Sequence, residues 1–228
     1  MTKVQLPEIV VGDKNNKYYK NDVIILICGE ERFDKRLHEQ VIEKITQIFP
    51  YDYLVFNPED TEEYLKLHPA EIQMWKYYDT VEVLPDKYSF IIRFRNDINW
   101  NENFVPTWDI FREAYAHGLT VGIQSFNYRR VLHNETRKQF IGDLIVFHTR
   151  NVLKNPRKNP SFVNPKVREK KLTWESMKDF CPHRAWFEMF DPINQRCHYN
   201  ADIRLYRQPE ILKIWPKGLM PPDFGDEE

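Results

Sequence analysis

The sequence predicts an α/β fold with a mixed, mainly parallel sheet flanked by helices. The main observation is the order of the first elements: an apolar run at residues 22–28, an amphipathic segment at 33–49 and a strand-like run at 51–56. A strand–helix–strand order of this kind joins parallel strands. The first run is apolar throughout, which is typical of a central strand covered on both faces. At 228 residues, the chain is long enough for one substantial domain.

The alternation of helices and strands continues downstream. Residues 59–67 and 70–83 predict two helices, and in the second the apolar side is expected to carry Ile72, Trp75 and Tyr78. The remaining expected elements are a strand at 88–95, a helix from about 107 that ends at Gly118, strands at 119–124, 140–148 and 197–206, and short helices at 174–180 and 184–190.

These elements predict one main domain. Residues 1–21 are expected to form an N-terminal arm with turns, residues 22–215 the domain, and residues 216–228 an acidic tail. Residues 150–172 contain prolines and many cations and predict an exposed basic loop inserted into that domain.

Composition places the chain among ordinary soluble proteins, with 42% hydrophobic and 29% charged residues. The sequence contains no run of about 18 apolar residues, so it predicts no membrane span. The start of the chain lacks the apolar core of a signal peptide. Three cysteines without a CxxC pair favour a reducing, cytoplasmic location.

Positive charge is concentrated in one part of the chain. Residues 128–171 carry twelve Lys or Arg and three acids, a net charge of +9, whereas the whole chain has a net charge of −1. Such a block indicates a polyanionic partner. The alternative is a solvated loop that happens to be rich in lysine.

The segment YSFIIRFRNDINW, residues 88–100, carries the strongest functional signal. In a strand, Tyr88 and Phe94 would share one face, whereas Arg93 and Arg95 would share the other, roughly 7 Å apart. Two guanidinium groups followed by Asp97 could hold a diphosphate and its metal ion. The alternative is an edge strand whose arginines lie in solvent.

Several common site motifs are absent from the sequence. There is no GxxxxGK[ST] or GxGxxG loop, so a phosphate must be held by side chains or by a metal. A zinc site built from Cys181, His183, Cys197 and His198 is not favoured, because the spacing is irregular for zinc modules.

Four short motifs together resemble a glycosyltransferase family. They are Gln73 in EIQMWKYYD, Arg93/Arg95/Asp97 in FIIRFRND, Asp143 in FIGDLIVFH, and residues 184–190 in HRAWFEMF. The pattern is similar to soluble sugar transferases of the WavE lipopolysaccharide-synthesis type and to viral and bacteriophage relatives with a GT-A-like, Rossmann-like nucleotide-sugar fold. One departure is the triplet Arg95-Asn96-Asp97, because such enzymes usually have Asp-x-Asp there.

The resemblance implies a nucleotide-diphosphate sugar as donor. Arg93, Arg95, Gln73 and Asn99 would bind the donor, and Asp97 would bind a divalent cation, Mn or Mg. Asp143 would be the general base toward a hydroxyl acceptor, with Glu188 in reserve. For Asp143 the alternative is a strand-end residue that caps a turn.

The basic block suggests the acceptor, with Arg129, Arg130, Arg137, Lys138 and Lys158 as candidate contacts. The first hypothesis is a hydroxymethylated base in bacteriophage DNA, which places the enzyme in the host cytoplasm. The alternatives are a surface polysaccharide or lipopolysaccharide acceptor, and a non-catalytic nucleic-acid-binding protein.

Overall fold

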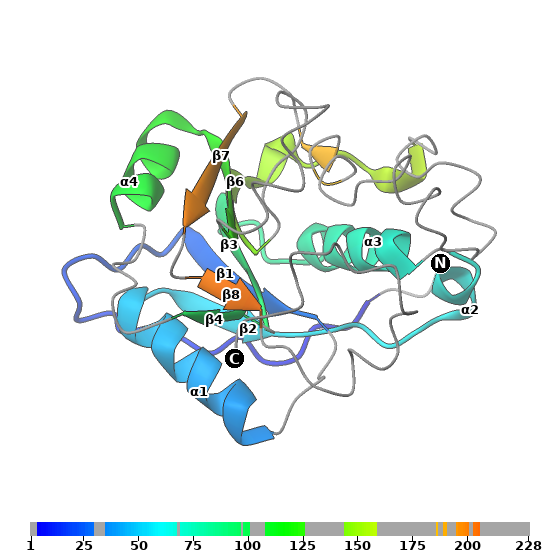
Figure 1. Ribbon diagram of the computed structural model, residues 1–228, viewed down its shortest axis with the longest axis horizontal. Coiled ribbons are helices and arrows are strands. Elements are labelled where there is room, and N and C mark those ends of the chain that lie inside the picture. The colour runs from blue at the N-terminus through cyan, green and yellow to red at the C-terminus, as the bar shows by residue number, and fades with distance from the viewer. Residues whose placement is uncertain are drawn as a thin grey trace, which may run out of the picture.

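The computed structural model describes residues 4–29, 35–67, 69–96, 98–100, 108–125, 144–158, 186, 189–190, 195–200 and 203–205. Its elements, in chain order, are β1 (Val23–Cys28), α1 (Lys35–Ile48), β2 (Asp52–Val55), α2 (Glu62–Leu65), α3 (Pro69–Glu82), β3 (Phe90–Arg95), β4 (Ile98–Trp100), α4 (Trp108–His117), β5 (Thr120–Ser125), β6 (Ile145–Thr149), the 3-10 turns η1 (Arg150–Val152) and η2 (Pro156–Lys158), β7 (Gln195–Asn200) and β8 (Ile203–Leu205) (Figure 1).

Within the described residues, one six-stranded sheet has the order β2-β1-β3-β6-β5-β7, and β4 pairs with β8 in a small second sheet. Strand β1 runs parallel to both β2 and β3, and β5 runs parallel to β7. Strand β6 is antiparallel to its neighbours β3 and β5, so it alone runs against the other five. The predicted mixed, mainly parallel α/β fold is therefore confirmed.

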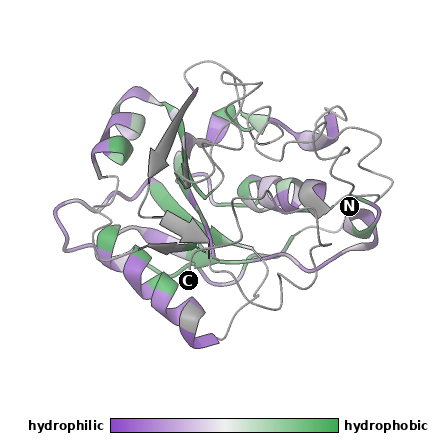
Figure 2. Cartoon of the chain, viewed as in Figure 1, coloured by the Kyte–Doolittle hydropathy of each residue, from purple (hydrophilic) through white to green (hydrophobic). Residues whose placement is uncertain are grey.

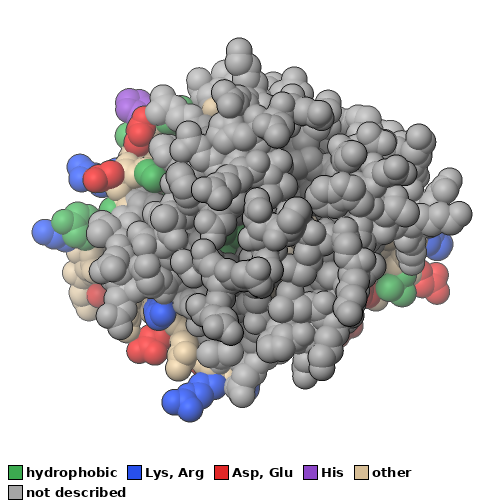
Figure 3. Space-filling model, viewed as in Figure 1, with side chains coloured by type: hydrophobic (Ala, Val, Ile, Leu, Met, Phe, Trp, Pro, Cys, Tyr) green, Lys and Arg blue, Asp and Glu red, His purple; other side chains and the backbone are tan. Residues whose placement is uncertain are grey.

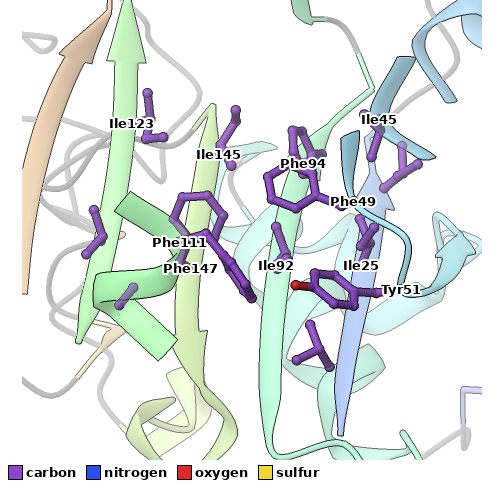
Figure 4. Close-up of a cluster of buried hydrophobic side chains, with 14 of the residues drawn as sticks. Ile25, Ile45, Phe49, Tyr51, Ile92, Phe94, Phe111, Ile123, Ile145 and Phe147 are labelled. Atoms are coloured by element: carbon purple, nitrogen blue, oxygen red, sulfur yellow. The ribbon is translucent and has the colours of Figure 1, made fainter. Parts of the chain in front are cut away.

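Helices cover the six-stranded sheet on both faces (Figure 1). On one face, buried side chains of α1 and α4 pack against β1, β3, β5 and β6 in an aromatic-rich core. Figure 4 shows part of it, with Phe49, Phe94, Phe111 and Phe147 gathered over Ile92. On the other face, α3 packs against β1, β3 and β6 in a second core.

The apolar sequence of β1 follows from this layering. Ile25 and Ile27 lie in the core under α1 and α4, whereas Ile24 and Leu26 lie in the core under α3. Both faces of the strand are buried because neighbouring side chains point to opposite faces of a sheet. Hydrophobic residues accordingly dominate the coloured strands in Figure 2, and Figure 3 shows Lys, Arg, Asp and Glu side chains of described residues on the surface.

The N-terminal arm docks on the edge of the sheet at β2. Val10 and Tyr53 exchange two backbone hydrogen bonds of 2.9 Å. The buried Asp52 carboxylate accepts hydrogen bonds from Gly12 N (3.0 Å), Tyr19 Oη (2.8 Å), Lys87 Nζ (3.0 Å) and Tyr88 Oη (2.7 Å). Burial acts to raise the pKa of this carboxyl, but the four hydrogen bonds outweigh it and lower the pKa to about 2.

Three predicted strands differ in extent from the observed ones. Strand β3 begins at Phe90, and Tyr88 packs in the core under α3 rather than beside Phe90. Strand β6 runs from Ile145 to Thr149, and residues 140–143 of the strand expected over 140–148 lie outside the described residues. The expected strand at 197–206 is two strands, β7 and β8, because its two halves pair with different partners, β5 and β4.

Helix α3 also differs from its expected orientation. Its buried apolar side is formed by Met74, Tyr77, Tyr78 and Val81, whereas Ile72 and Trp75 are only partly buried. Apolar and aromatic residues occur on most sides of this helix, so the sequence pattern does not select one face. Helix α4 ends as expected, at Gly118 with φ of 60° and with the Leu119 N–H donating to the Ala114 carbonyl at 2.9 Å.

No helix among the described residues is both long enough and apolar enough to cross a membrane.

Candidate functional site

A pocket lies at the carboxyl ends of β1, β2 and β3. In open α/β sheets this edge is where ligands bind. The following described residues line the pocket, here called the cationic pocket: Leu26, Cys28, Gly29, Leu54, Phe56, Asn57, Pro58, Gln73, Lys76, Tyr77, Thr80, Arg93, Arg95 and Asn96.

Strand β3 supplies both arginines of the cationic pocket. Phe90, Ile92 and Phe94 point into the core under α1 and α4. Arg93 and Arg95 lie at the alternate positions and line the pocket on the opposite face. The alternation predicted over 88–95 is therefore confirmed from Phe90 to Arg95 and is wrong at Tyr88. The two arginines line one concave site rather than an exposed strand edge.

Helix α3 forms one side of the cationic pocket. Gln73, Lys76, Tyr77 and Thr80 line it at spacings of three, four and seven residues, which place them on one helical face. This α3 pocket face adds Lys76, which was not among the site residues predicted from the sequence. Lys76, Tyr77 and Thr80 follow Gln73 at helical spacing, so the sequence could have placed them on the same face as Gln73. Only the packing of α3 shows that this face borders the pocket.

The described lining of the cationic pocket carries positive charge. It contains Lys76, Arg93 and Arg95, and no described lining residue is a carboxylate. Lys76 is mostly buried, with its side chain 9% exposed, and its Nζ lies 2.7 Å from Asp60 Oδ1, whose side chain is 50% exposed. Concave surfaces with this charge and with arginine forks favour phosphate groups.

Arg93 lies within an aromatic setting. Only 3% of the residue is exposed. The centre of its guanidinium, Cζ, lies 4.1 Å from the centroid of the Trp186 ring and 5.6 Å from that of Tyr77. Contacts of a guanidinium with aromatic faces are favourable, and more so where water is excluded.

The turn after β1 approaches β3 closely in the cationic pocket. Gly29 has φ of 141°, and a Cβ built there would lie 2.4 Å from Asn96 Oδ1. The Asn96 side chain in turn donates from Nδ2 to the Gly29 carbonyl at 2.9 Å. A glycine is required at this position because both the backbone angle and the space exclude a side chain.

The structure brings together some of the predicted site residues. Arg93, Arg95 and Gln73 line the same pocket. The other predicted residues, apart from Lys158, have side chains outside the described residues: Asp97, Asn99, Asp143, Glu188, Arg129, Arg130, Arg137 and Lys138. Their predicted roles stay predictions.

The described part of the basic loop at 150–158 is more structured than expected. Arg150 donates to the Glu82 and Pro85 carbonyls at 3.2 Å each. Arg157 has a side chain only 15% exposed and forms ion pairs with Asp79 of α3 and Glu63 of α2. Arg157 therefore neutralises acids of the protein itself, and Arg150 binds backbone carbonyls and lies 3.4 Å from Asp86 Oδ1. Lys158, in contrast, is exposed.

The described residues do not by themselves supply a metal site. No group of three or more His, Cys, Asp or Glu side chains lies together among them, and those lining the cationic pocket offer cations and amides rather than carboxylates. The predicted cation ligand, Asp97, lies outside the described residues.

Comparisons with known proteins find a remote likeness among solved structures. No protein-family model matches the chain, and no curated protein matches it. Among solved structures, the chain is similar to a glycosyltransferase involved in the glycosylation of the major capsid of PBCV-1. The two share 15% sequence identity with a TM-score of 0.42, over 78% of this chain and 81% of that one. A likeness this loose carries no argument about function, which depends on the pocket itself.

Proposed function

We propose that this protein is a glycosyltransferase that uses a nucleotide-diphosphate sugar, and that the cationic pocket binds the diphosphate of the donor. The observation that carries the proposal is the placement of Arg93 and Arg95 with Lys76 in one pocket at the carboxyl ends of parallel strands. The sequence motifs around Gln73, Arg93 and Arg95, which resemble those of sugar transferases, support it independently.

The arginines have a defined role in this proposal. When the bond between sugar and diphosphate breaks, negative charge grows on the leaving diphosphate. Preorganised cations in a site with little water stabilise that charge more than water would. Arg93 and Arg95 supply this stabilisation, and Lys76 adds to it only in part because it is paired with Asp60. Gln73 and Asn96 offer amide groups for hydrogen bonds with the donor.

The acceptor hydroxyl must lose a proton as it attacks the sugar. Asp143 is the proposed general base, with Glu188 as the alternative carboxylate. The sequence places Asp143 two residues before β6, the strand that pairs with β3. A divalent cation at Asp97 stays a separate prediction, which is tested by comparing donor hydrolysis with manganese and with a chelator.

Calorimetric titration with uridine diphosphate and with inorganic pyrophosphate tests the donor site. We expect Arg95→Gln to weaken binding of either ligand by about 10- to 100-fold, because a hydrogen bond to a charged group contributes about 1.5–3 kcal/mol. Arg112→Gln on α4 is a matched control, because that arginine is 73% exposed and outside the pocket. Equal affinities of wild type and Arg95→Gln would contradict the proposal.

The proposed acceptor is a hydroxymethylated base in bacteriophage DNA. Support comes from the net charge of +9 over residues 128–171. The positive charge available to DNA is smaller than this, because Arg150 and Arg157 are paired with acids of the protein. An electrophoretic shift assay measures the affinity for duplex DNA. This affinity should fall by about 10³- to 10⁵-fold between 50 and 200 mM salt if six to ten phosphates are contacted. If the DNA is not shifted at either salt concentration, a polysaccharide acceptor is favoured. A shift without any nucleotide binding favours a non-catalytic nucleic-acid-binding protein.

A further inference from the structure

We propose that Tyr77 and His148 are positioning residues for Arg93, and that their hydrogen bond holds the guanidinium where it can meet the donor diphosphate. This inference rests on the proposed function. Neither residue was identified as functional from the sequence. Tyr77 lies on the α3 pocket face, whereas His148 lies in β6 and is completely buried.

The contacts form a continuous path from β6 to Arg93. His148 Nε2 is hydrogen-bonded to the Tyr77 hydroxyl. The Tyr77 ring lies 5.5 Å from the Trp186 ring, and the Arg93 guanidinium contacts both rings. The His148 ring also packs on Phe190, with centroids 4.8 Å apart. The aromatic groups around Arg93 are therefore held from a neighbouring strand.

The direction of the hydrogen bond follows from the partners of the imidazole. His148 Nδ1 lies 2.8 Å from the Thr149 carbonyl oxygen, which can only accept, so Nδ1 carries the hydrogen. Burial lowers the pKa of His148 to about 4, which keeps the ring neutral near pH 7. Nε2 is therefore an acceptor, and the Tyr77 hydroxyl donates to it.

The same pair connects α3 to the strand next to β3. His148 is opposite Ile91 in the β3–β6 register, and Val146 of β6 is opposite Arg93. The hydrogen bond thus links the α3 pocket face to the part of the sheet that carries Arg93. Arg157 holds α3 at another point, through its ion pair with Asp79.

The test uses Tyr77→Phe in the full chain, because this change removes one hydroxyl and keeps the ring. Titration with inorganic pyrophosphate should show binding weakened about 3- to 10-fold relative to wild type, the range of one hydrogen bond between uncharged groups. In an Arg93→Gln background the same change should alter the dissociation constant less than about 2-fold, because its effect acts through Arg93.

Tyr64→Phe is the matched control. Tyr64 is also buried and also donates a hydrogen bond to a neighbouring element, to Asp79 Oδ2 at 2.6 Å, but it does not line the pocket. We expect it to lower the melting temperature and to leave pyrophosphate binding within about 2-fold of wild type, because it breaks a bond that does not involve Arg93. Tyr77→Phe, in contrast, should change both the melting temperature and the affinity for pyrophosphate.

His148→Gln keeps an acceptor for the Tyr77 hydroxyl and should bind pyrophosphate more tightly than His148→Phe, which has none. The inference is overturned if Tyr77→Phe changes the melting temperature alone, or if its effect on binding persists unchanged in Arg93→Gln. Wild-type protein that does not bind pyrophosphate at all overturns the proposed function and this inference with it.

Discussion

The Asp52 carboxylate is expected to make the folded protein sensitive to acid. It lies at the start of β2, at the opposite end of the strand from the cationic pocket, and is 1% exposed. Its pKa falls from an ordinary value of 3.8 to about 2 in the folded protein. A carboxyl whose folded pKa is depressed adds stability above its unfolded pKa, and this stability is lost as the pH falls through the folded pKa.

The size of the effect follows from that difference. At about 1.36 kcal/mol per pKa unit, the ionised Asp52 contributes about 2 kcal/mol to the free energy of unfolding at neutral pH. Protonation removes this contribution between about pH 4 and pH 2. From pH 6 to pH 3, about 1 kcal/mol of it should be lost, because the unfolded chain is then largely protonated while the folded protein is not.

Urea unfolding of wild type and of Asp52→Asn at pH 6 and pH 3 measures this loss. The variant lacks the titration, so the difference in unfolding free energy between the two proteins should shrink by about 1 kcal/mol at the lower pH. Asp109→Asn serves as the control, since that side chain is 98% exposed. A difference that is the same at both pH values would refute the idea that the four donors hold Asp52 ionised.

Two further changes test the site and the helix beside it. Gly29→Ala should destabilise the fold by about 1–3 kcal/mol in urea unfolding and weaken pyrophosphate binding, because the new Cβ would displace Asn96; unchanged stability would contradict the observed turn. Arg157→Ala should cost about 2 kcal/mol in the same assay because it leaves Asp79 without its cation, and Arg157→Lys should restore only part of this because lysine lacks the planar fork. The exposed neighbour Lys158→Ala is the control, and an equal loss in Arg157→Ala and Lys158→Ala would exclude a structural role for the ion pair.

Local patterns in the sequence were sufficient to predict the layered sheet and the arginine strand. A continuous apolar run predicts a strand buried on both faces, and β1 has this environment. Alternation over residues 90–95 predicts that Phe90, Ile92 and Phe94 face one side and the arginines the other. Such patterns depend only on the geometry of a single strand, so they can be read without knowing its neighbours.

The extent and orientation of other elements depended on their partners. Strand β8 is separate from β7 because it pairs with β4, and the sequence of residues 197–206 does not contain that information. Helix α3 has apolar residues on most sides, so only its packing decides that Met74 and Val81 are buried while Lys76 borders the pocket.

The order of amino acids alone accounts for two alternate arginines at the end of an apolar strand and for a strongly basic stretch after residue 128. Where these charges lie relative to other groups depends on the packing of distant segments. This packing joins Lys76 to the arginines in one pocket, and it pairs Arg150 and Arg157 with the protein's own groups. The physical reason is that charge and alternation are local properties, whereas concavity and ion pairing arise from residues distant in the chain.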